Sequence, residues 1–292
     1  MGVCHRKETH PMLFKEVADH IVGLDKLDKF KPQAIKDIVW AFATAGESHP
    51  QLFNKLADEA IKRQHDFTPQ GIANFLWAYA TNGQVDEHLF SSLVPSAKDN
   101  LDKYNEQELA NVAWAYSVAN VDTPSVFNKE FINACLEKEV EDEFELEALL
   151  QLHQWQLWQD EIKSDISLPS SLKKRCYEEF ISRVPDPSSL QDDVVSILSS
   201  MGLQPKEEVL LKSGYRIDAV VEVNGNQIAV EVDGPFHFIG RSGERNGSTI
   251  LKHRQVASLD GIKVMSVPYW EWDKLTTDSK KKELYLRHLG LK

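Results

Sequence analysis

A repeated pattern of apolar and polar positions runs through the first two thirds of the chain. Residues 30–46 match residues 67–83 at nine of 17 positions without a gap, and a third copy occupies residues 104–120. The second copy places apolar side chains at the i, i+3, i+4, i+7 spacing of one helix face, at Ile72, Phe75, Leu76 and Tyr79. The repeat length of 37 residues is that of a helix pair, so the pattern predicts an array of helical hairpins.

Each repeat is expected to consist of a first and a second helix. The first helices are predicted over residues 32–45, 69–82, 106–119 and 143–158. The second helices are predicted over residues 10–24, 49–64, 86–101, 124–138 and 170–183. The last unit has lost the repeated Trp, which is typical of a capping repeat. Residues 1–185 are therefore predicted to form an α-solenoid.

Three tryptophans mark the repeats, because Trp40, Trp77 and Trp114 recur at the 37-residue spacing. Exposed aromatic side chains stack on the bases of single-stranded nucleic acid. Regular spacing within a helical array nevertheless favours packing between neighbouring repeats. We therefore expect these tryptophans in the core and assign no base-reading role to them.

The pattern changes period in the C-terminal third. Predicted elements are a helix ending near residue 201, strands at 209–211, 215–223 and 227–234, a helix at 249–259, a strand at 263–268 and a helix at 278–288. Asn224-Gly225 between two β-branched runs predicts a two-residue hairpin. Residues 186–292 are therefore predicted to form a small α/β domain that follows the solenoid.

The hairpin register brings acidic residues together. With Asn224-Gly225 as the turn, Asp218 lies opposite Glu231, with Cβ atoms roughly 5 Å apart. Like charges at that distance are destabilising unless a cation joins them, and a divalent metal supplies one. A three-residue turn would leave the two carboxylates on a diagonal. The two-residue turn also sets Arg216 opposite Asp233, which predicts a cross-strand ion pair.

Composition and charge narrow the classes of function. The chain has 292 residues, 42% of them apolar and 27% charged, which is a globular composition. Its three cysteines contain no CxxC pair, which excludes a disulfide framework and a cysteine zinc site. No apolar run approaches the roughly 18 residues of a membrane-spanning helix, so no membrane partner is expected.

The net charge of −12 is unevenly distributed. Residues 186–292 carry 15 acidic against 14 basic side chains, whereas residues 1–185 carry 30 against 19. Phosphate contacts come from Lys and Arg. A polyanion is therefore expected to prefer the C-terminal third.

Motifs in this C-terminal third resemble the RAP domain. They are Arg216-Ile-Asp218, the segment 229–238 with its Asp-Gly-Pro-x-His-Phe sequence, Leu251-Lys-His-Arg254 and the segment 264–272. Asp218 followed by Glu231-Val-Asp233, a helix and a strand is also similar to the PD-(D/E)xK restriction-endonuclease-like fold. The resemblance covers about residues 205–275.

RAP domains typically follow octotricopeptide or FAST-kinase-like helical repeats in organellar RNA-processing proteins. The resemblance thus implies binding of single-stranded organellar RNA to control its processing, stability or translation, in a mitochondrion or plastid. The chain shows no Arg-rich, acid-poor leader, so the location rests on the resemblance alone.

The resemblance leaves RNA cleavage open, because the Lys of the Glu-x-Lys motif is replaced by Asp233. In an active metal-dependent endoribonuclease, Asp218 and Glu231 would hold Mg²⁺ or Mn²⁺ and Asp233 would assist. Lys252 would supply the missing positive charge and His237 would act as base. Without cleavage, no cofactor is expected.

A basic and aromatic set is expected to bind RNA, and it comprises Arg216, Arg241, Arg245, Lys252, His253, Arg254 and Tyr269. The glycine-rich loop 240–247 that contains two of these arginines could equally be a mobile linker. A third hypothesis is a protein-interaction scaffold, in which the acidic solenoid docks a basic RNA-processing protein and the α/β domain is inert.

Overall fold

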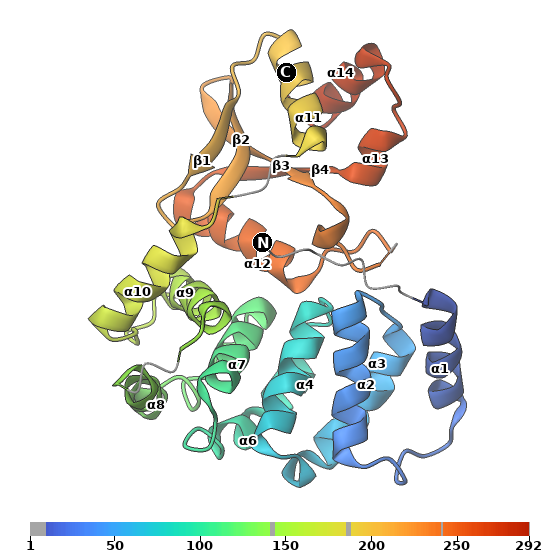
Figure 1. The fold of residues 1–292 in the computed structure, drawn as a ribbon, viewed down its shortest axis with the longest axis vertical. Coiled ribbons are helices and arrows are strands. Elements are labelled where there is room, and N and C mark those ends of the chain that lie inside the picture. Colours follow the sequence, from blue (N-terminus) through green and yellow to red (C-terminus); the bar gives the residue numbers. More distant parts are fainter. Residues whose placement is uncertain (1–9, 141–143, 185–187, 241, 292) are drawn as a thin grey trace.

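The computed structural model describes residues 10–140, 144–184, 188–240 and 242–291. Helices α1 to α10 form a layered array that fills the lower half of Figure 1. Their bounds are α1 Pro11–Gly23, α2 Pro32–Ala45, α3 Pro50–Lys62, α4 Pro69–Thr81, α5 Glu87–Ser92, α6 Val94–Lys98, α7 Glu106–Ala119, α8 Lys129–Val140, α9 Leu146–Glu161 and α10 Ser170–Ser182. The first helices of successive repeats, α2, α4, α7 and α9, pack side by side.

Local sequence sets the helix ends. Thr68 caps α4 by accepting a hydrogen bond from the Gly71 N–H at 3.0 Å, and Asn105 forms a capping box with Glu108 on α7. The segment predicted as one helix over 86–101 is instead divided into α5 and α6. Pro95 lies at this break, and its missing N–H prevents a continuous helical hydrogen-bond pattern.

Tyrosines connect neighbouring repeats. The buried hydroxyl of Tyr79 donates to the Phe53 carbonyl at 2.6 Å, and that of Tyr116 donates to the Phe90 carbonyl at 2.9 Å. Both bonds span 26 residues, from a first helix back to the preceding second helix. The repeat in sequence is therefore a repeat in hydrogen bonding, inside one continuous apolar core.

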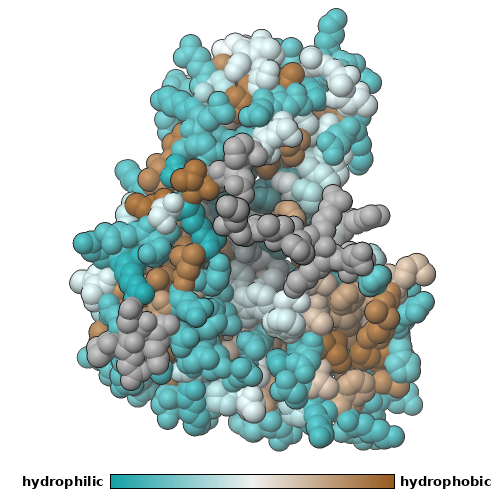
Figure 2. All heavy atoms as spheres, in the orientation of Figure 1, coloured by the Kyte–Doolittle hydropathy of each residue, from teal (hydrophilic) through white to brown (hydrophobic). Residues whose placement is uncertain are grey.

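The first helix of the array is less covered. Met12, Leu13 and Val17 of α1 are exposed, and Figure 2 shows apolar side chains gathered at that edge, on the lower right. No helix in the described ranges is long and apolar enough to cross a membrane.

A four-stranded sheet with flanking helices follows the array. Its elements are α11 Ser189–Ser200, β1 Lys206–Leu210, β2 Arg216–Val223, β3 Asn226–Asp233, α12 Gly247–Gln255, β4 Lys263–Pro268, α13 Tyr269–Asp273 and α14 Ser279–His288. The strand order is β1-β2-β3-β4, antiparallel except for the parallel pair β3–β4. The chain thus consists of a helical array followed by a small mixed α/β unit. The expected boundary at residues 185 and 186 lies outside the described residues.

The predicted hairpin register is confirmed. Val223 pairs with Asn226, and Asn224 and Gly225 adopt the positive φ angles, 53° and 77°, of a two-residue turn. The ladder runs back to Ala219 opposite Val230. This register decides which side chains of β2 and β3 share a face.

The two faces of the sheet meet different partners. One face packs on α11, α13 and α14 through Val230, Val194 and Leu286. The other face packs on Val256, which directly follows α12, and on Leu157 of α9. The sheet is therefore joined to the array by a shared apolar cluster.

Helix α12 lies between the sheet and the array (Figure 1). Its first residue, Gly247, packs so closely on α4 that an added Cβ would lie 2.1 Å from the Ala80 carbonyl oxygen. Only glycine allows this approach.

Candidate functional site

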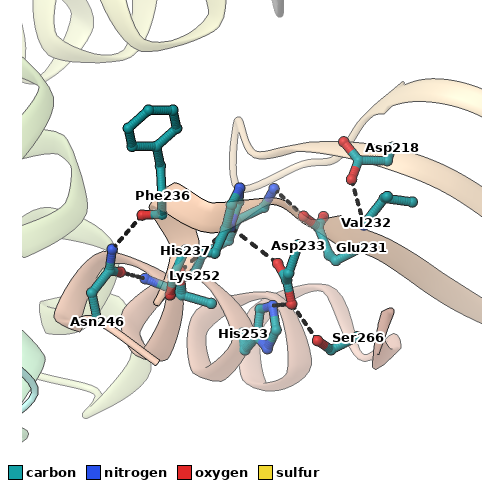
Figure 3. A network of polar contacts seen from close by, with 11 residues as sticks. Asp218, Glu231, Val232, Asp233, Phe236, His237, Asn246, Lys252, His253 and Ser266 are labelled. Carbon is teal, nitrogen blue, oxygen red and sulfur yellow. Dashed lines mark hydrogen bonds and ion pairs between the residues drawn. The ribbon is translucent and has the colours of Figure 1, made fainter. Parts of the chain in front are cut away.

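A carboxylate cluster lies at the C-terminal end of β3. Because side chains alternate along a strand, Glu231 and Asp233 point to the same face, toward α12. Both are buried, with 1% and 0% of the residue exposed. Helix α12 supplies the consecutive residues Lys252 and His253 to the same place (Figure 3).

Glu231 is paired with a cation from α12. The Lys252 ammonium donates to Glu231 Oε2 at 2.6 Å. Burial raises the pKa of Glu231 to about 7, although the attraction of Lys252 opposes the shift. On β3, Asp233 occupies the position of the lysine in the Glu-x-Lys motif. The positive charge comes instead from Lys252 on α12.

Asp233 is held by several polar neighbours. It accepts a hydrogen bond from the Ser266 hydroxyl, and His237 Nδ1 lies 3.0 Å from its Oδ1. His253 Nε2 lies 4.0 Å from its Oδ2. Burial disfavours the charged form, but the bonds from His237 and Ser266 prevail and lower the pKa of Asp233. Burial lowers the pKa of His253 to about 4.

Asp218 lies at the margin of this cluster. One of its carboxylate oxygens accepts a hydrogen bond from the Val232 N–H at 2.7 Å (Figure 3), and burial raises its pKa. The group of close potential metal ligands is formed by Glu231, Asp233 and His253, whose donor atoms lie within 4.8 Å of one another. Asp218, predicted as a ligand together with Glu231, is not in that group.

The predicted ion pair between Arg216 and Asp233 is wrong. Arg216 instead donates to the Glu208 carbonyl at 3.2 Å, and Asp233 is occupied by the neighbours described above. The reason is that the described β2–β3 ladder ends at Ala219 and Val230, so the two residues are not held in register.

A groove of about 940 Å³ separates the first-helix face of the array from the α/β unit. On the array side it is lined by the three repeated tryptophans and by the amides Asn74, Gln107, Asn111, Gln151 and Gln154. On the opposite side it is lined by Tyr215, Arg216, Ser248 and Lys252. Lys252 therefore connects the groove to the carboxylate cluster.

The repeated tryptophans differ in exposure. Trp114 is 4% exposed and packs in the core as predicted, and Trp77 is half-buried. Trp40 is 44% exposed, so its prediction as a core residue is wrong. Trp40 lies on α2, whereas the helices that pack on α12 are mainly α4, α7 and α9.

Amide side chains of neighbouring first helices meet along the groove. Asn111 donates to Asn74 at 3.5 Å, and Gln107 donates to Gln151 at 2.9 Å. Asn74 and Asn111 are 37 residues apart and so occupy the same place in successive repeats, whereas Gln107 and Gln151 are 44 residues apart and do not. The 37-residue recurrence could therefore have identified Asn74 and Asn111 in the sequence, but not the contact between Gln107 and Gln151.

The predicted RNA-binding residues do not form one patch. Arg216 and Lys252 line the groove, Arg245 is exposed in the loop before α12, and Tyr269 is half-buried beside Trp270. His253 belongs to the carboxylate cluster. Arg241 lies outside the described residues.

Arg254 has a different role from the predicted one. Its guanidinium donates to Glu161 of α9 at 3.1 Å and to the carbonyls of Ser117 and Val118 of α7. These bonds turn Arg254 toward the array, so we remove it from the proposed RNA-binding set.

Phe236 was missed by the sequence analysis. It is 75% exposed and follows the buried end of β3. Its ring points away from the carboxylate cluster (Figure 3), and its carbonyl accepts a hydrogen bond from Asn246 at 2.7 Å. It adds an exposed aromatic surface to this side of the domain.

The C-terminal part of the chain is similar to a known protein family and to a curated protein. Residues 230–289 match the RAP domain family model, so the predicted resemblance is confirmed there. A chloroplastic RAP domain-containing protein from Oryza sativa subsp. japonica is 34% identical over 103 residues. The aligned part is 35% of this chain and 16% of that relative, so the chain spans a small part of its relative's length.

Proposed function

Because residues 230–289 form a RAP domain, we propose that the protein binds single-stranded RNA in an organelle and acts in RNA processing, stability or translation. The groove between the array and the α/β unit is the proposed binding site. The helical array is assigned to the octotricopeptide or FAST-kinase-like type by its association with this domain. The name of the rice relative supports a plastid, and a mitochondrion is the alternative location.

The observation that carries this proposal is the opposition of aromatics and cations across the groove. Trp40 and Trp77 lie on one side, and Arg216 and Lys252 lie on the other. Aromatic rings stack on bases and basic groups contact phosphates, which is the combination used for single strands. The amides of the array add hydrogen-bonding groups that suit base edges.

The acidic array limits where RNA can bind. A net charge of −12 repels a polyanion in general, so attraction must come from local cations. Exposed Arg245 extends the basic groups beyond the groove. We therefore expect modest affinity with a shallow dependence on salt, set by few phosphate contacts.

The test is binding of labelled single-stranded RNA, measured by fluorescence anisotropy at fixed moderate salt. Trp40→Ala removes an exposed groove residue, and Leu284→Ala removes an exposed apolar side chain of α14 outside the groove. A lost base stack costs about 1–3 kcal/mol, so Trp40→Ala should weaken binding roughly five- to 150-fold. Equal affinity of both variants and the wild type would refute the groove as the RNA site.

A metal-dependent endoribonuclease is the second candidate. In this chain Asp233 stands at the position of the lysine in the nuclease motif. The ammonium of Lys252 on α12 contacts Glu231 and so places a positive charge at the site from another element, which favours this candidate. The pair Asp218→Ala with Glu231→Ala should abolish any Mn²⁺-dependent RNA fragments on a gel. A shift without fragments in the wild type favours binding alone, and neither shift nor fragments favours the protein-interaction scaffold.

A further inference from the structure

We propose that Glu231, Asp233 and His253 bind a divalent transition-metal ion. Their donor atoms lie within 4.8 Å of one another, although the third residue comes from a different element. Glu231 and Asp233 are two positions apart on β3, and His253 projects from α12 onto the same face. This site differs from the Asp218–Glu231 pair that the nuclease resemblance implies, and it depends neither on RNA binding nor on cleavage.

Unpaired polar atoms support the site. Glu231 Oε1 and His253 Nε2 are buried and have no hydrogen-bond partner among the described residues. Asp233 Oδ1 already has His237 Nδ1 at 3.0 Å, so the support from unpaired atoms comes from Glu231 and His253. A buried polar atom left unpaired costs about 1–3 kcal/mol. One cation would satisfy an atom from each of the three residues.

The charges at the cluster also favour a cation. Two acidic side chains are fully buried here, with Asp218 at the margin, while the cation in direct contact is Lys252. Lys252 takes Glu231 Oε2 and leaves Oε1 free for another partner. Buried carboxylates require compensating charge, and a dication provides it without displacing this ion pair.

The surrounding residues hold the proposed ligands in place. Ser266 on β4 and His237 fix the Asp233 carboxylate, and Lys252 fixes that of Glu231. Such outer contacts orient ligands at established metal sites. The ligands themselves lie on a central strand and a packed helix, which are rigid supports.

The ligand set selects the class of metal. Two carboxylates and an imidazole suit Zn²⁺, Mn²⁺, Fe²⁺ or Co²⁺, because imidazole is a good ligand for first-row transition ions. Mg²⁺ and Ca²⁺ prefer oxygen ligands and water. The site should therefore discriminate against these two ions.

The test is equilibrium dialysis of the full chain against Zn²⁺, with Mg²⁺ in excess. The wild type should retain one Zn²⁺ per chain, and His253→Gln and Asp233→Asn should each lower the affinity at least tenfold. His288→Gln and Glu222→Gln alter an exposed histidine of α14 and an exposed acid of β2, so they should bind as the wild type does. No stoichiometric Zn²⁺ in the wild type, or unchanged affinity in His253→Gln, overturns the proposal.

A second measurement needs no variant and so does not depend on variant folding. Electron spin echo spectroscopy of the Mn²⁺-loaded wild type should show coupling to imidazole nitrogen, because His253 is the proposed nitrogen ligand. Coupling to water protons alone would overturn the assignment of His253.

Discussion

The guanidinium of Arg254 lies 3.1 Å from the carboxylate of Glu161 and joins the α/β unit to the helical array. The same side chain donates to the carbonyls of Ser117 and Val118, near the end of α7. Carbonyls in the last turn of a helix carry partial negative charge, which favours a cation beside them. Arg254 of α12 thus bonds to two helices of the array, α7 and α9.

Replacing Arg254 should loosen this junction. Arg254→Met leaves Glu161 partly buried without its cation and exposes two carbonyls, and breaking a pair of this kind costs on the order of 3 kcal/mol. The free energy of unfolding in urea should fall by that amount. Arg287→Met on α14 is the matched control, because Arg287 is exposed. A loss no larger than that of the control would mean that the bond contributes little.

Gly247→Ala should disturb the packing of α12 on α4. A Cβ there would lie 2.1 Å from the Ala80 carbonyl oxygen, so backbone must move. We expect a lower melting temperature and faster amide hydrogen exchange in α12. Gly23→Ala is the control, since nothing lies within 4 Å of a Cβ at that position. If both variants melt alike, the contact is not as tight as described.

His153 should make the junction sensitive to acid. Its Nε2 lies 2.9 Å from the Ser213 carbonyl, and burial lowers its pKa from the usual 6.5. The unfolded chain therefore takes up a proton first as pH falls through 6.5, and the stability due to neutral His153 is lost below that pH. The slope contributed by this one group cannot exceed about 1.4 kcal/mol per pH unit.

The measurement is the free energy of unfolding of the wild type and of His153→Gln between about pH 8 and pH 5. Glu231, with a raised pKa of about 7, acts in the opposite direction, so the difference between the two proteins isolates His153. The difference in free energy of unfolding between the wild type and His153→Gln should become smaller as the pH falls. A constant difference would show that His153 does not titrate differently in the folded state.

Features that depend on neighbouring residues in the chain, such as helix bounds and the hairpin register, could be predicted from the sequence. The 37-residue period gave α2 and α7 with their observed bounds, and Asn224-Gly225 fixed the hairpin register. The prediction of Trp40 as core was wrong, because exposure depends on how elements distant in the sequence pack around a side chain. No local pattern contains that information.

The candidate site was predicted in part. Lys252 was predicted to supply positive charge in an active nuclease, but its ion pair with Glu231 was not predicted. The role of Arg254 was not predicted either, because its partner Glu161 is 93 residues away and belongs to the other domain. Pairings across a domain junction depend on docking geometry, which neither periodicity nor motif spacing encodes.

The repeated tryptophans should differ in their effect on stability. Trp114 is buried and its indole N–H donates to Gln154 at 2.9 Å, whereas Trp40 is 44% exposed. Truncating a buried Trp to Ala costs about 3–5 kcal/mol, while an exposed site usually changes stability by about 0.5 kcal/mol. Urea unfolding should therefore show a large loss for Trp114→Ala and a small one for Trp40→Ala. Equal losses would mean that Trp40 is packed in solution and is not available to stack on RNA.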